Sequence, residues 1–216
     1  PIGLMLLTAI MVVGSMRMQD IVHFQSGGFW NWIVFRNPFT FIAFFLYFIC
    51  SLAETNRLPF DIPEAESEIV AGYHTEYSGM RFAFFFLEEY GNIFFVSAVA
   101  STVFLGGWYG LIGEEAFIPG PFIFIIKALV LVFVIMWLRW TLPRIRVDQL
   151  MYLSWKVLIP FGFICVIGTG IWMLLGIAGR TVILILLLSA VAIGVWTTIT
   201  EAKRDLREGK IQFLKG

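Results

Sequence analysis

Residues 116–138 read AFIPGPFIFIIKALVLVFVIMWL, and this run decides the fold class. Lys127 is its only charged residue, and it lies near the middle of the run. A helix needs about 20 mainly apolar residues to cross the hydrocarbon core of a bilayer. The run therefore predicts a membrane-spanning helix with a single lysine at its centre.

Comparable apolar runs lie on both sides of this segment. Uncharged stretches cover residues 1–16, 38–53, 91–113, 157–175 and 181–200, and the third is expected to begin earlier, near Arg81. Neither the alternation of a strand nor an internal repeat is evident. The predicted fold is all-α: a polytopic bundle of six transmembrane helices over residues 1–200, followed by a charged cytoplasmic tail at 201–216.

The composition agrees with a membrane protein. Hydrophobic residues make up 59% of the chain, charged residues 14%, and the mean hydropathy is +0.87. Soluble domains average about 45–50% apolar and about 25% charged residues, so the excess apolar surface needs lipid. Fifteen basic and fifteen acidic residues give a net charge of zero, which disfavours a nucleic-acid partner.

The cysteines give no sign of a metal or cluster site. Cys50 and Cys165 each lie inside an apolar run, and no CxxC spacing occurs, so we expect two small buried side chains. No cofactor is expected in this chain, and any electron carrier should belong to another polypeptide. Because Pro1 opens directly into an apolar run, we also expect the chain to begin within a longer protein.

The basic residues predict an orientation. Six spans place the loop 54–80, the turn 139–150 and the tail on one side of the membrane, and most lysines and arginines between spans lie there. The opposite side holds Arg17, Arg36 and Arg180. Since cytoplasmic loops carry the excess of basic residues, the loop 54–80 is predicted to face the cytoplasm or matrix.

That loop is unusually acidic. It reads ETNRLPFDIPEAESEIVAGYHTEYSGM, with Arg57 as its only lysine or arginine and with six acids, which are Glu54, Asp61, Glu64, Glu66, Glu68 and Glu76. Closely packed carboxylates would raise some of their pKa values, as a proton relay requires. A structural interpretation is also open, because Asp61 can cap a helix whose first turn contains Pro63 and two glutamates.

Two further ionisable residues fall within predicted spans, where a charge costs at least about 2.5 kcal/mol and function is the default hypothesis. Glu89 lies about two turns inside the third span and is either a relay group or a member of a structural ion pair. Its neighbour Glu88 should point about 100° away and be exposed. Lys127 is too central to reach water easily; it either neutralises a buried carboxylate such as Glu89 or belongs to the relay.

Several motifs together resemble one family. The run AETNRLPFD at 53–61, the glutamates of EAESE at 64–68 and the pair Glu89-Tyr90 are similar to the H subunit of respiratory complex I, the proton-translocating NADH:quinone oxidoreductase. The run RIRVDQLM at 144–151 resembles a turn of the same family. The resemblance covers roughly residues 1–175 and lacks the family's first helices.

The resemblance implies a membrane subunit that helps form the quinone-binding cavity and couples quinone reduction to proton translocation through buried carboxylates. The residues that match relay positions are Glu54, Glu64, Glu66, Glu68 and Glu89, with Lys127 as a further candidate; Arg57 and Asp61 would order the loop. Quinone would be the substrate, with FMN and iron–sulfur clusters in partner subunits of the peripheral arm and further partners in the membrane. The implied location is a bacterial inner membrane, or alternatively that of mitochondria.

Two other functions stay open. A hydrogenase-linked or formate-linked complex uses an equivalent subunit, and an ion transporter could use the acidic loop as a gate. Transporters often contain inverted repeats with matching broken helices, and no second acidic loop is evident in this sequence. The full motif pattern favours the quinone enzyme.

Overall fold

The computed structural model describes residues 1–55, 59–60, 77–110, 119–143, 145–175, 179–181 and 183–189, and isolated positions up to 200. Every regular element among these residues is a helix, which confirms the predicted all-α class. The chain divides into two compact units, residues 1–171 and residues 172–216.

The first unit begins with a broken helix. Helix α1 (Ile2–Val13) ends at Gly14, whose backbone is left-handed (φ 76°) and whose N–H donates to the Ile10 carbonyl. Helix α2 (Met18–Phe24) follows at a bend of 61°. The 3-10 turn η1 (Phe29–Asn31) and the short helix α3 (Ile33–Arg36) then lead into α4 (Pro38–Glu54), which has proline in its first turn.

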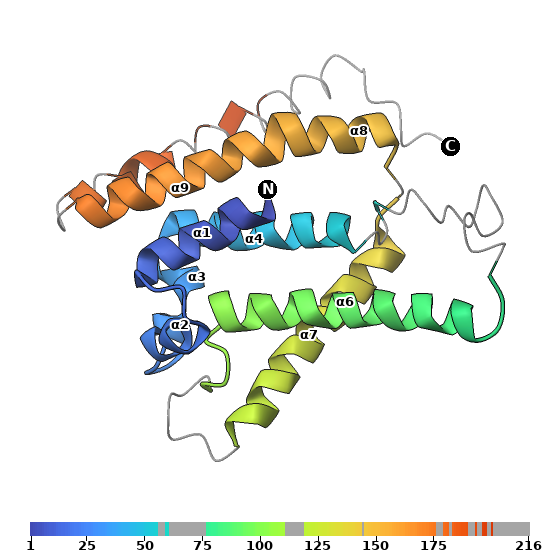
Figure 1. Cartoon of the computed structure of the whole chain (residues 1–216). Helices are drawn as coiled ribbons and strands as arrows, with labels where there is room; N and C mark the ends of the chain where they lie inside the picture. Colours follow the sequence, from blue (N-terminus) through green and yellow to red (C-terminus); the bar gives the residue numbers. More distant parts are fainter. Residues whose placement is uncertain are drawn as a thin grey trace. The chain divides into compact units, whose positions relative to one another are not determined.

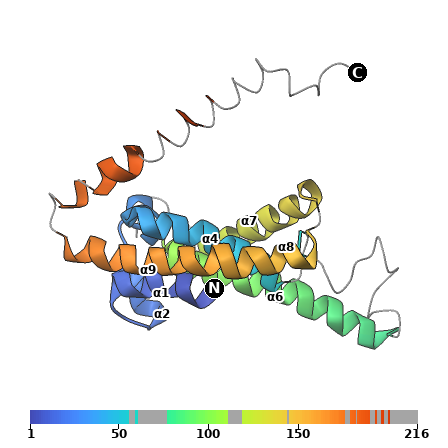
Figure 2. The same cartoon turned by 90° about the horizontal axis from the view of Figure 1, so that it is seen from above.

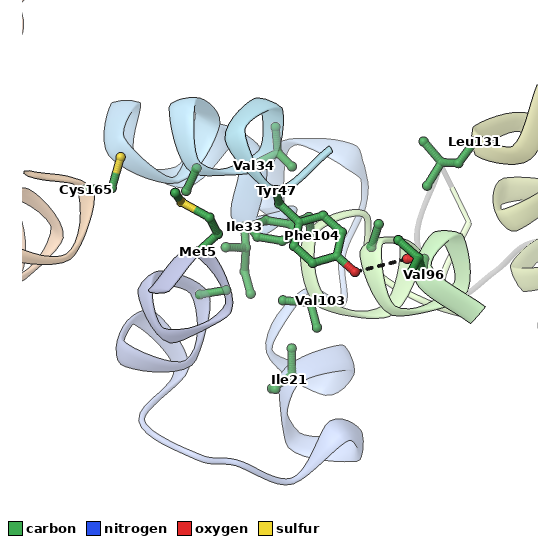
Figure 3. Packing of buried hydrophobic residues seen from close by; sticks show 13 residues of the cluster. Met5, Ile21, Ile33, Val34, Tyr47, Val96, Val103, Phe104, Leu131 and Cys165 are labelled. Atoms are coloured by element: carbon green, nitrogen blue, oxygen red, sulfur yellow. Dashed lines mark hydrogen bonds between the residues drawn. The ribbon is translucent and has the colours of Figure 1, made fainter. Parts of the chain in front are cut away.

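The main apolar core lies where α1 and α4 meet the C-terminal half of α6 (Met80–Phe104) (Figure 3). Met5, Tyr47 and Phe104 are each at most 2% exposed. The Tyr47 hydroxyl donates to the carbonyl of Val96 at 3.1 Å, so α4 and α6 are joined by a hydrogen bond as well as by packing. The predicted buried cysteines are confirmed, since Cys50 and Cys165 are both free and buried.

Helices α6 and α7 (Gly120–Thr141) cross each other in the first unit (Figures 1 and 2). Helix α6 starts close to Arg81, as expected, but it ends at residue 104, before the predicted end at 113. The reason is that Gly106 and Gly107 both adopt positive φ angles, which stop the helix. Large apolar side chains are exposed along α7, among them Ile126, Val130 and Phe133, as expected of a surface in lipid.

Helix α8 (Val147–Tyr152) runs through a π-helical turn (Leu153–Leu158) into α9 (Ile159–Leu174). Pro160 lies just after the wide turn. A proline has no backbone N–H to donate to the preceding turn, and a π-helical turn is one way for a helix to accommodate it. This turn carries Ser154 and Leu158, which recur in the site below.

Six spans are not confirmed. Among the described residues, three helical stretches are long and apolar enough to cross a membrane: Met80–Phe104, Gly120–Thr141 and Val147–Leu174. The bent pair α1 and α2 can count as a fourth, whereas α4 has only 17 residues. Counting apolar residues does not detect the break at Gly14, whereas the shortness of α4 agrees with the short uncharged run predicted at 38–53.

The second unit contains the end of α9 and a short apolar helix, Gly179–Ser189. Within it, the Arg180 side chain donates from Nε to the carbonyl of Trp172 at 3.1 Å. Only part of the sixth predicted span, 181–200, is described, and the predicted tail at 201–216 lies outside the described residues.

Candidate functional site

The structure describes three of the eight predicted site residues. Glu54, Glu89 and Lys127 lie within the described part of the chain. The other five lie outside it: Arg57, Asp61, Glu64, Glu66 and Glu68.

Glu54 is the last residue of α4, and it lines a cavity of about 470 Å³. Its walls come from four elements: α1, α4, α8 and the π-helical turn. Helices α1 and α4 run side by side (Figure 1). Most of the described lining is apolar, and among the residues that the structure describes Glu54 is the only acidic side chain in it; the other described lining residues are Pro1, Ile2, Gly3, Cys50, Ala53, Leu150, Ser154 and Leu158. The cavity thus combines an apolar interior with one carboxylate.

The acidic loop 54–80, which we call the acidic segment, is anchored between helices at Pro59 and Phe60, near its start. Phe60 is 4% exposed and packs with Leu52 of α4, Ile93 of α6 and Ile135 of α7. Beside it, the carbonyl of Pro59 accepts the N–H of Ile145 at 2.9 Å. We call Phe60, Leu52, Ile93 and Ile135 the Phe60 cluster. The PF pair of the AETNRLPFD motif is therefore the point at which the acidic segment is held against the helices.

Glu89 lies on α6 one turn before the Phe60 cluster. Residues four apart lie on the same face of a helix, so Glu89 shares the face of Ile93. Glu89 is half-buried and Glu88 is exposed, which confirms the predicted difference between the two neighbours. The structure therefore brings the second predicted carboxylate to the cluster that anchors the acidic segment.

Arg139, at the end of α7, is one of the basic residues that predict the membrane orientation, and the sequence predicts no role for it in the site. It is half-buried and lines a cavity of about 10 Å³ with Tyr90, Ile93, Ile135 and Met136. That volume is about the minimum for one water molecule. The sequence signal was its position: the first charged residue after the apolar part of α7 meets the face of α6 that carries Glu89.

Lys127 is satisfied by backbone carbonyls. Its Nζ donates to the carbonyls of Leu105 (2.6 Å), Gly107 (3.2 Å) and Tyr109 (2.6 Å), and it lies 4.4 Å from the ring centroid of Trp32. Glu89 lies 16 residues before Leu105, about 24 Å away along the axis of α6. Of the two roles predicted for Lys127, neutralisation of Glu89 is therefore wrong, because the lysine reaches the opposite end of the helix. Membership of the relay stays a prediction.

Gln25 is a polar residue to which the sequence assigned no role. It is fully buried, and its Nε2 lies 3.1–3.2 Å from the carbonyls of Ile21, Thr102 and Val103. Its Oε1 accepts the N–H groups of Ile33 (3.2 Å) and Gly106 (2.9 Å). The only local signal is a glutamine between apolar residues and a Gly-Gly pair; the partners, 77–81 residues away, could not be inferred.

Known proteins share most of this sequence. A family model described as NADH dehydrogenase matches residues 1–170. The chain belongs to this family. Among its relatives is the H subunit of NADH-quinone oxidoreductase from Chlorobaculum parvum, which is 54% identical over 186 residues, covering 81% of this chain and 52% of the relative.

Two further bacteria carry relatives with the same name. The H subunit from Anaeromyxobacter dehalogenans is 45% identical over 194 residues, covering 81% of this chain and 47% of that protein. The H subunit from Bacteroides fragilis is 49% identical over 172 residues, covering 76% and 47%. This member of the NADH dehydrogenase family thus spans about half the length of the curated relatives that it matches.

Proposed function

We propose that this chain is part of the H-type membrane subunit of a proton-pumping NADH:quinone oxidoreductase, and that it couples quinone reduction to proton translocation. Membership of the family and the names of the relatives support the class of enzyme. The observation that supports the coupling role is the Phe60 cluster, in which Phe60 packs with Ile93, a residue one helical turn after Glu89 on α6.

The proposed relay consists of the carboxylates Glu54, Glu64, Glu66, Glu68 and Glu89, with Arg57 and Asp61 ordering the segment between them. The apolar cavity beside Glu54 supports a lipid-soluble quinone as the substrate. Reduction of a quinone to a quinol takes up two electrons and two protons. Protons withdrawn from nearby carboxylates would leave charge that the rest of the relay must redistribute, which links the reaction to proton movement.

The redox centres are proposed to lie elsewhere. The described residues contain no group of three or more histidine, cysteine or acidic side chains placed to hold a metal. Electrons would reach the quinone from FMN and iron–sulfur clusters in peripheral partner subunits, while other membrane subunits would carry protons onward. The side of the membrane formed by 54–80, 139–150 and the tail carries more lysines and arginines than the opposite side, which supports a cytoplasmic position for the acidic segment. The bacterial relatives support a bacterial inner membrane.

Copurification in mild detergent tests this assignment. The expected result is that the affinity-tagged protein brings down stoichiometric membrane and peripheral subunits containing flavin and iron–sulfur clusters. A hydrogenase in place of the NADH-oxidising partner would replace the proposal with the hydrogenase-linked alternative. A single-chain particle in native membranes would favour a transporter.

Topology gives an independent check. A cysteine introduced into 54–80 should be labelled only from the cytoplasmic side of sealed vesicles. Labelling by an impermeant reagent added to the periplasmic side of intact cells would contradict the orientation on which proton uptake by the relay depends.

A further inference from the structure

The C-terminal end of α6 raises a specific problem of hydrogen bonding. The last turn of any helix leaves carbonyl groups without partners inside the helix. Within a membrane, water is not available to satisfy them, and each unsatisfied group costs several kcal/mol. The turn 105–110 that follows α6 adds further carbonyls, because Gly106 and Gly107 have left-handed backbones and form no continuing helix.

Side chains from two other elements satisfy these carbonyls. Gln25, after α2, bonds to Thr102 and Val103 in the last turn of α6. Lys127, from α7, donates to three carbonyls of the turn, those of Leu105, Gly107 and Tyr109. Gln25 and Lys127 therefore divide the carbonyls between them, one taking the helix and the other the turn.

The site around Lys127 matches the chemistry of a primary ammonium. Such a group has three N–H donors, and three carbonyl oxygens receive them. The Trp32 ring provides a fourth, cation–π contact at 4.4 Å, and its indole is itself 9% exposed. A guanidinium is planar and presents its donors as a rigid fork, so arginine would not fit the same three oxygens.

Gly106 brings the two halves of this site together. A Cβ on Gly106 would lie 2.7 Å from Nε1 of Trp32, so the turn packs directly on the edge of the indole. The N–H of the same residue donates to Gln25. Gly106 therefore holds the turn, whose carbonyls bind the ammonium, against the Trp32 ring, which contacts the ammonium from another side.

We propose that Lys127 is a positioning residue whose tethered ammonium fills a primary-ammonium site made of the Leu105, Gly107 and Tyr109 carbonyls and the Trp32 ring, and so holds the end of α6. This role requires the charge and the donors of the lysine but no exchange of its proton. It is independent of the function proposed above, since it concerns where α6 is held. By holding α6, it also fixes the helix on which Glu89 is carried.

The test uses a buried thiol as a reporter in native membranes. Ser101 is fully buried in the last turn of α6, so Ser101→Cys should be labelled slowly by a permeant maleimide while the turn is closed. Ser97→Cys, one turn earlier and also buried, is the matched reporter away from the site. Labelling is counted as the difference from the same protein without the introduced thiol.

Three variants of the lysine site separate charge from volume. Lys127→Met keeps most of the volume without donors, and both it and Lys127→Ala should speed labelling of Ser101→Cys by about tenfold or more, with less effect at Ser97→Cys. Propylammonium replaces the atoms that Lys127→Ala removes. It should slow labelling in that variant and not in Lys127→Met, whereas tetramethylammonium, which lacks N–H donors, should do nothing. Lys127→Arg should resemble Lys127→Met.

Several results would overturn the proposal. These are slow, wild-type labelling in Lys127→Met, equal protection by tetramethylammonium, and failure of propylammonium to protect Lys127→Ala. If Lys127→Ala does not accumulate in membranes, accumulation in cells grown with propylamine becomes the readout, and no recovery would count against the site. None of these measurements depends on quinone reduction, so they stand or fall separately from the proposed activity.

Discussion

An ionisable side chain lies at each of two places along α6, Glu89 on the helix itself and Lys127 of α7 against its C-terminal end, and the structure uses them differently. At the C-terminal end, the Lys127 ammonium is surrounded by backbone carbonyls and an indole ring. Toward the N-terminal end, Glu89 lies beside the cluster that anchors a segment rich in carboxylates. An ionisable residue within a predicted span can therefore serve either of two purposes. Lys127 helps to hold the backbone in place, whereas Glu89 is proposed to belong to a group of titratable side chains.

The largest effect on stability is expected at the acidic end, from Phe60→Ala. Removing a well-packed phenylalanine costs about 3–5 kcal/mol and would release the start of the acidic segment. We expect lower amounts of assembled complex and a lower melting temperature of the remainder. Phe133→Ala is the control, because Phe133 is 67% exposed in this chain. Equal losses in both variants would show that the Phe60 cluster is not a special anchor.

At the other end, Gly106→Ala should have the next largest effect. A left-handed backbone costs an alanine about 1–2 kcal/mol, and overpacking against Trp32 adds about 1–3 kcal/mol. Gly14→Ala separates the two causes, since Gly14 also has a left-handed backbone but its Cβ would meet nothing within 4 Å. Thermal melting should rank Gly106→Ala below Gly14→Ala. The reverse order would contradict the contact between the turn and Trp32.

A smaller loss is expected from Gln25→Leu, about 1–3 kcal/mol, because carbonyls of Thr102 and Val103 would lose a donor. Gln19→Leu is the matched control, because Gln19 lies in the neighbouring helix α2 and its side chain is exposed. Thermal melting of the two variants measures the difference. Equal stability would mean that Gln25 does not help to hold the end of α6.

The sequence predicted the helical class because apolar runs of about 20 residues are typical of membrane-spanning helices. It also placed the start of α6 near Arg81, and it distinguished Glu88 from Glu89 by the angle between consecutive helical residues. Those features depend on local composition and on helical periodicity. The same local information did not predict the bend between α1 and α2, because the direction of α2 depends on the left-handed backbone of Gly14 rather than on composition.

The site was predictable only in part. The motif at 53–61 drew attention to carboxylates, but the anchoring by Phe60 depends also on contacts with α6 and α7, which are distant in the sequence. The partner of Lys127 was predicted wrongly because a buried cation suggests a buried anion. Three carbonyls serve equally well when a helix ends nearby, and the sequence does not show which helix end will lie beside the lysine.

The coupling role proposed for the acidic end is tested most directly by replacing Glu89 with glutamine. Glu89→Gln keeps the shape of the side chain and removes one titratable proton. Glu88→Gln is the matched control, because it makes the same change at the exposed neighbour.

Quinone reductase activity, electron transfer to an artificial acceptor of the peripheral arm, and proton pumping are measured in the same membranes, with Glu66→Gln as a second variant in the acidic segment. We expect quinone reduction and pumping to fall by about a hundredfold or more in Glu89→Gln and also in Glu66→Gln, because a positioned proton-transfer group contributes about 10²–10⁴-fold. Artificial-acceptor activity and assembly should stay at the level of Glu88→Gln. Wild-type quinone reduction and pumping in Glu89→Gln would remove this carboxylate from the coupling mechanism.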